Sequence, residues 1–187
     1  ANMAMLLYVP VFDVALPYWI QSDTHAPGFI IAVLIAVNTL SVVLFQVSIS
    51  ERVDSMSRGR AAIRLSAVAL AGGSLLFSMT GGMASSLATA ILVAGAGLMV
   101  LGEMLQSAAG WLVSYSLAPD DSMGQYQGVF NTGTAVAQSL GPSILLLVLS
   151  WAGGGGWMAI AAVFVVSGTT FAMILPREPL REPVLAK

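Results

Sequence analysis

Residues 87–117 read LATAILVAGAGLMVLGEMLQSAAGWLVSYSL, an apolar stretch in which Glu103 is the only charged side chain. A helix needs about 20 residues to cross the hydrocarbon core of a bilayer, and this stretch exceeds that length. A helix that is apolar on every side is buried either in a large protein core or in a membrane. We therefore expect residues 87–117 to span a membrane.

The rest of the chain has the same character. Of its 187 residues, 57% are hydrophobic and 9% are charged, whereas about a quarter are charged in an ordinary soluble domain. Short polar or Gly/Pro-containing stretches separate the further apolar runs, which are residues 3–20, 28–49, 61–82, 125–150 and 155–175. The sequence predicts an all-α, polytopic membrane helix bundle with six transmembrane helices, in which residues 1–176 form the membrane domain and 177–187 a cytoplasmic tail.

The basic residues predict the orientation of these spans. All seven fall between the second and third runs, in the first residues of the third, or after the sixth: Arg52, Arg58, Arg60, Arg64, Arg177, Arg181 and Lys187. Cytoplasmic loops carry the excess of Lys and Arg, so both termini should be cytoplasmic in an integral protein of a bacterial cytoplasmic membrane. Trp19, Trp151 and Trp157 lie beside the loops assigned to the outer face, and we expect them at headgroup depth.

The composition also limits the metal sites and catalytic groups that the protein can form. The sequence has no cysteine and a single histidine, His25, in a predicted loop. Thiolate and multi-histidine metal sites are therefore excluded, and an intramembrane serine protease would lack its histidine base. With the basic residues confined to span ends, a nucleic-acid partner is not expected. We expect a protein that is not an enzyme and that holds no cofactor or metal.

The first residues carry no basic leader. The chain begins Ala1-Asn2-Met3 and becomes apolar almost at once, unlike a secretory signal peptide with a charged start. This favours a chain that begins in the middle of a longer protein. A mature chain trimmed by processing, or a small membrane protein complete in itself, is the alternative.

Two acidic residues lie deep in the apolar runs, Asp13 in the first and Glu103 in the fourth. A charge at the bilayer centre costs several kcal/mol, so such residues usually face a bundle interior or a watery cavity and mark ion or substrate pathways. Both are proton-coupling candidates. The structural alternatives are a buried hydrogen-bond partner for Glu103 and, for Asp13, an acid at the outer interface beside a bend between Pro10 and Pro17.

Polar side chains in the spans supply weaker candidates. Gln106 follows Glu103 by three positions and should share its helix face, so that both could contribute to one substrate site. Asn38 in the second run is a second candidate for the same cavity. Either side chain could instead cross-link helices by hydrogen bonding.

The stretch between the second and third runs, residues 50–60, reads SERVDSMSRGR. It resembles the acid-and-arginine cytoplasmic loop of the major facilitator superfamily, with Asp54, Arg58 and Arg60 at the acidic and basic positions. The resemblance implies a gating loop that holds an acid against arginines and helix ends in one conformation. The alternative is a solvated positive loop.

A longer likeness runs through the second half of the chain. Gly102-Glu103, the segment 124–128 reading GQYQG, and Gly141-Pro142 occur in this order. They resemble the tenth helix of drug-exporter-like major facilitators and the start and middle of the eleventh. Gly102, Gly128, Gly141 and Pro142 are the expected helix-packing positions, because small residues let helices approach closely in lipid.

The resemblance implies the carboxy-terminal half of a twelve-helix transporter, folded as two three-helix repeats. Its first and fourth spans would line the cavity. The expected function is proton-coupled export of a small molecule, with an amino-terminal six-helix half of the same transporter and the lipid bilayer as partners. A non-catalytic membrane subunit, structural or signalling, is the alternative.

Overall fold

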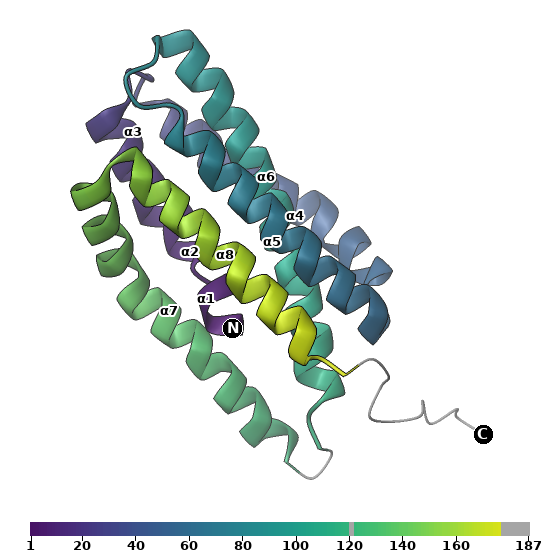
Figure 1. The fold of residues 1–187 in the computed structure, drawn as a ribbon. Helices are drawn as coiled ribbons and strands as arrows, with labels where there is room; N and C mark the ends of the chain where they lie inside the picture. Colours follow the sequence, from purple (N-terminus) through teal and green to yellow (C-terminus); the bar gives the residue numbers. More distant parts are fainter. Residues whose placement is uncertain (120–121, 177–187) are drawn as a thin grey trace.

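The computed structural model describes residues 1–119 and 122–176 of the chain, and within them the secondary structure is helical without strands. These residues contain six helices long and apolar enough to cross a membrane. They are the first span, Asn2–Asp23, followed by α4 (Ile30–Arg52), α5 (Met56–Ser78), α6 (Ser85–Ser116), α7 (Met123–Ala152) and α8 (Gly154–Ile174). Figure 1 shows them as an elongated bundle. The predicted tail, 177–187, lies outside the described residues.

The first span is not one regular helix. It consists of α1 (Asn2–Met5), α2 (Tyr8–Pro10), the π-helix η1 (Val11–Ala15) and α3 (Leu16–Asp23). Pro17 has no N–H to donate to the carbonyl of Asp13, four residues earlier, so regular α-helical bonding is interrupted there. π-helical turns of this kind occur often at functional sites. Asp13 therefore lies at an irregular turn of the first span, between Pro10 and Pro17.

The best-packed part of the bundle is α5, which lies against both α6 and α8. Small residues permit this close packing. A Cβ added to Gly73 of α5 would lie 2.8 Å from the carbonyl oxygen of Gly95 on α6, and a Cβ on Gly168 of α8 would collide with the Ala67 side chain. Close backbone approach through small residues is the usual packing of membrane helices.

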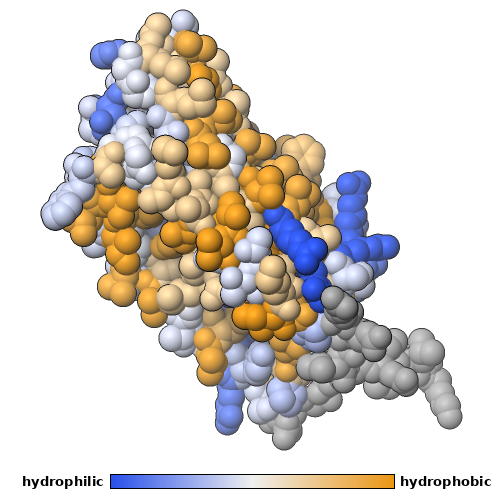
Figure 2. All heavy atoms as spheres, in the orientation of Figure 1, coloured by the Kyte–Doolittle hydropathy of each residue, from blue (hydrophilic) through white to orange (hydrophobic). Residues whose placement is uncertain are grey.

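Helices α4 and α7 are covered far less than α5. Only 11% of the span window in α4 and 22% of that in α7 is buried, against 56% for α5. Large exposed apolar side chains on α4 include Leu40, Val43, Leu44, Phe45 and Val47. Figure 2 shows apolar side chains over the middle of the visible face and the strongest hydrophilic colours towards its ends. Such apolar surfaces suit lipid or further helices.

Alternate connections meet at one end of the bundle. The N–H of Gly82, between α5 and α6, donates to the carbonyl of Asp23 at the end of α3 (3.2 Å). Trp19 Nε1 donates to Thr80 Oγ1 (2.9 Å), and Trp19 meets Trp157 of α8 edge to face, with ring centroids 6.2 Å apart. The connections after the first, third and fifth spans are thus neighbours, as six antiparallel spans require.

Two of the three tryptophans expected at headgroup depth are buried between spans. Trp19 and Trp157 are 2% and 0% exposed. Trp157 also packs edge to face with Phe77 (centroids 5.1 Å apart), so the two tryptophans belong to the protein core. Trp151, the third residue of that prediction, is 86% exposed.

Two predicted loops are shorter than expected. Residues 51–60 were predicted as a polar connection, but α4 continues to Arg52 and α5 begins at Met56. Residues 151–154 were also predicted as a connection, between the fifth and sixth runs. Only Gly153, with φ +52°, lies between α7 and α8. The start of α8 lies close to α7, and glycine at position 156 permits this approach. A Cβ on Gly156 would lie 3.0 Å from the Val148 carbonyl oxygen.

Candidate functional site

Glu103 lies in the interior of α6 and is half-buried. Its Oε2 accepts a hydrogen bond of 2.7 Å from Nδ2 of Asn38 on α4. The preceding residue, Gly102, allows α6 to approach α5: a Cβ there would lie 2.6 Å from Cγ of Leu70. The acid is therefore held by a neutral donor from a neighbouring helix, in the well-packed middle of the bundle.

The first span brings two further ionisable side chains towards Glu103. The carboxylate of Glu103 interacts electrostatically with Asp13, at the π-helical turn, and lies within electrostatic range of the buried phenol of Tyr8. The side chain of Asp13 is exposed on the surface of this chain. The two acids predicted from sequence therefore interact electrostatically, and Asn38 and Tyr8 are the polar groups near Glu103.

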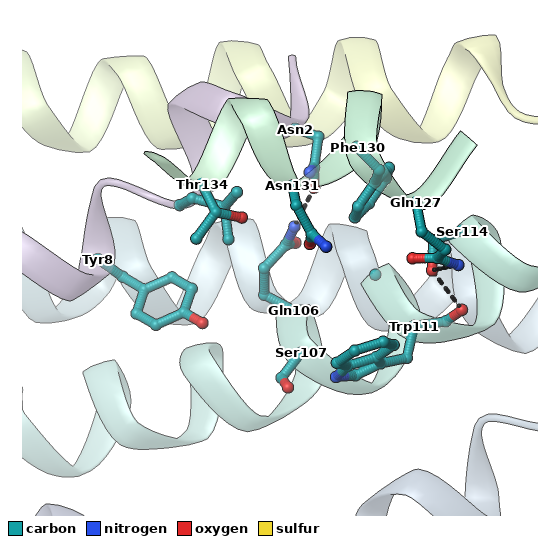
Figure 3. Close-up of a pocket in the computed structure, with 12 residues that line it drawn as sticks. Asn2, Tyr8, Gln106, Ser107, Trp111, Ser114, Gln127, Phe130, Asn131 and Thr134 are labelled. Carbon is teal, nitrogen blue, oxygen red and sulfur yellow. Dashed lines mark hydrogen bonds between the residues drawn. The ribbon is translucent and has the colours of Figure 1, made fainter. Parts of the chain in front are cut away.

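A cavity of about 210 Å³ opens between the first span, α6 and α7. Figure 3 shows its lining side chains converging from these three elements. They are Asn2, Leu6, Tyr8, Gln106, Ser107, Gly110, Trp111, Ser114, Gln127, Phe130, Asn131 and Thr134. Among the residues the structure describes, none with a charged side chain lines this cavity. It offers amides, hydroxyls and aromatic rings.

Hydrogen bonds fix part of the cavity wall. Gln106 Nε2 donates to Asn2 Oδ1 (2.9 Å), and Gln127 Nε2 donates to Ser114 Oγ (3.2 Å). Gln106 is 1% exposed, and its Oε1 has no hydrogen-bond partner among the described residues. An unpaired buried acceptor costs about 1–3 kcal/mol, so this oxygen is a ready position for a donor.

Tyr8 joins the two regions. It lines the cavity and also lies within electrostatic range of Glu103. Tyr8 is therefore a side chain shared by the cavity wall and the surroundings of the acid.

Comparisons with known proteins supply no relative. No family model, curated protein or solved structure matches this chain. The candidate site is therefore defined by its own geometry, in which Glu103 and the uncharged cavity are the two features with chemical content.

The structure separates the predicted substrate candidates. Asn38 contacts Glu103 and does not line the cavity, whereas Gln106 lines the cavity and bonds to Asn2. Tyr8 and Asn2 were missed. Tyr8 precedes Asp13 by five positions on an apolar span, which was a usable signal, but nothing in the sequence marks Asn2 as a partner of Gln106.

The predicted gating residues lie at the end of the bundle opposite Trp19 and Trp157. Arg58 Nη1 and Asp54 Oδ2 form an exposed ion pair (2.9 Å). Arg60 Nη1 donates to the carbonyl of Leu175, just after α8 (3.0 Å). Arg58 and Arg60 belong to α5 and only Asp54 lies in the connection, so an arginine does contact a helix end here, where cations are favoured.

The predicted helix-packing positions differ in how closely they approach neighbouring helices. A Cβ on Gly141 of α7 would lie 2.6 Å from Cγ of Pro10 in the first span, a contact as close as that of Gly102. A Cβ on Gly128 would meet no atom within 4 Å among the described residues. Pro142 lies inside α7, which continues on both sides of it.

Proposed function

We propose that this chain is the carboxy-terminal six-helix half of a proton-coupled secondary transporter of the major facilitator type that exports a small molecule. The observation that carries the proposal is Glu103, a half-buried acid in a membrane span, held at 2.7 Å by Asn38. An acid retained at this depth despite its cost is usually part of an ion or substrate pathway.

The coupling mechanism follows from the neighbours of Glu103. Protonation neutralises a carboxylate that interacts electrostatically with Asp13 of the first span. Tyr8, which is near this acid, also lines the cavity, so the change of charge occurs close to the pocket. A proton that binds one conformation better than another shifts the population of inward-open and outward-open states.

The partner half is supported by the incomplete covering of the bundle. Helices α4 and α7 are mostly exposed, yet α4 carries polar side chains that face neighbours, such as Gln46, which donates to the Met104 carbonyl of α6 (3.3 Å). The side chain of Asp13 is also exposed on this chain, and an acid at that depth needs a shielded, polar surrounding. Six further helices would provide it and close the cavity.

The orientation in this proposal has both termini in the cytoplasm of a bacterial cell, because the described basic residues gather where the second span ends and the third begins: Arg52, Arg58, Arg60 and Arg64. The proposed activity is transport without covalent chemistry. A non-catalytic subunit would need no alternating access to the cavity, and this difference provides the test.

Alternating access can be measured without knowing the substrate. The chain contains no cysteine, so Ser107→Cys places a reporter thiol in the cavity once any cysteines elsewhere in the full-length protein are replaced. We expect membrane-impermeant maleimide to label it from either side of sealed vesicles, because the cavity opens to each side in turn. Labelling from one side only would contradict the proposal and favour a static membrane subunit.

A further inference from the structure

We propose that the cavity between the first span, α6 and α7 binds an uncharged molecule that carries a planar ring and a hydrogen-bond donor, with an aromatic carboxamide as the simplest example. A ligand of this class would be the substrate of the proposed transporter. Only its role as a substrate rests on that proposal. Binding itself needs no transport.

The lining argues against an ionic ligand. Its polar groups are amides and hydroxyls, and no charged side chain among the described residues lines it. Removing an ion from water costs several kcal/mol unless an opposite charge compensates it. Glu103 bonds to Asn38 instead of lining the cavity. A neutral molecule avoids this cost.

The unpaired oxygen of Gln106 requires a donor. The Nε2 of this side chain already donates to Asn2, which leaves Oε1 buried and without a partner among the described residues. Figure 3 shows the Gln106 side chain directed towards Asn2 and Asn131 within the cavity wall. If the Gln106 side chain turns towards the cavity, a ligand N–H or O–H can reach this oxygen, and that bond would remove the cost of a buried, unsatisfied acceptor.

The remaining lining favours an aromatic ring. Tyr8, Trp111 and Phe130 come from the three elements around the cavity, and Trp111 is itself stacked on Tyr115, with ring centroids 5.6 Å apart. Aromatic rings gain from offset or edge-to-face contacts with one another. The volume of about 210 Å³ equals about seven water molecules at about 30 Å³ each, which is enough for one substituted ring.

The test compares benzamide with its charged isosteres benzoate and benzamidine, using full-length protein in lipid nanodiscs with Ser107→Cys as the single thiol. At ten times its dissociation constant, benzamide should slow maleimide modification of this thiol about tenfold by occupying the cavity. Benzoate and benzamidine should slow it less than about twofold at the same concentration, because each brings an uncompensated charge. A thiol at Ser57→Cys, on the exposed start of α5, should be unaffected by all three.

Two variants assign the effect to Gln106. Gln106→Met keeps the length of the side chain but removes the acceptor, so benzamide affinity should fall about fivefold or more. Gln106→Glu places a carboxylate in the wall and should reverse the preference towards benzamidine, which also provides a readout if Gln106→Met does not fold. Equal protection by all three compounds, no protection by benzamide, or an unchanged preference in the variant that folds would each overturn the proposal.

The outcome is separable from that of the transport proposal. Protection by benzamide in a protein whose cavity is labelled from one side only would retain this site and reject the transporter. Labelling from both sides without protection would retain the transporter and reject this ligand class.

Discussion

Nδ2 of Asn38 donates a hydrogen bond of 2.7 Å to Oε2 of Glu103 and so joins α4 to α6 in the middle of the bundle. Helix α4 has few other buried contacts, since only 11% of its span window is covered. The bond therefore has two roles. It compensates the burial of an acid, and it fixes a helix that packing alone holds weakly.

A double-mutant cycle measures this bond. Asn38→Ala and Glu103→Ala should each lower the unfolding free energy in detergent, and their combined effect should fall short of the sum by about 0.6 kcal/mol, with an upper bound of about 1.7 kcal/mol. The control is a cycle of Asn38→Ala with Thr89→Ala, whose effects should add. Thr89 precedes Glu103 on α6 and lies about 21 Å away from it along the helix, at 1.5 Å per residue. Strict additivity for Asn38 and Glu103 would show that the bond contributes nothing to stability.

The glycine before Glu103 should be sensitive to a single methyl group. Gly102→Ala would place a Cβ 2.6 Å from Cγ and 3.2 Å from the backbone nitrogen of Leu70, so the contact between α5 and α6 has to open at a cost of about 1–3 kcal/mol. Gly97→Ala, on the same helix, meets no atom within 4 Å among the described residues. Thermal unfolding should show a loss for Gly102→Ala and none for Gly97→Ala. Equal losses would contradict the packing argument.

Cysteine labelling tests the orientation. Single cysteines at Ser22 and Ser85, at the end where Gly82 bonds to Asp23, should react with an impermeant reagent added outside sealed cells. Ser57→Cys, in the first turns of α5 near the ion pair of Asp54 and Arg58, should not react until the cells are opened. Labelling of Ser57→Cys from outside would reject the proposed orientation.

The six spans could be predicted from sequence because the membrane imposes a length and a composition that few soluble helices share. The ends of the spans were harder to predict from the sequence. Residues 56–60 read as a polar connection because Arg58 and Arg60 are charged, yet these side chains point to water or to a helix end from within α5. A charged residue at a span end is compatible with either a loop or a terminal helical turn.

The site was predictable only in part. Burial of an acid is costly anywhere in a span, so Asp13 and Glu103 stood out from their positions alone. The hydrogen-bond partners of these acids depend on tertiary packing. Asn38 could therefore be recognised from the sequence as polar, but not as the donor to Glu103. The burial of Trp157 against Trp19 and Phe77 likewise arises from contacts between distant spans, which an aromatic residue near a span end does not reveal.

In the proposed mechanism Glu103 binds the coupled proton, and the pH dependence of alternating access is the decisive measurement. With Ser107→Cys as reporter, the ratio of labelling from the two sides of sealed vesicles should change with pH, because protonation biases the inward-open and outward-open states. Glu103→Gln keeps an acceptor for Asn38 but cannot release a proton, so the ratio should become independent of pH while the protein still accumulates in the membrane. Glu103→Asp should retain part of the dependence. An unchanged pH dependence in Glu103→Gln would contradict the account and make Asp13 the next residue to replace.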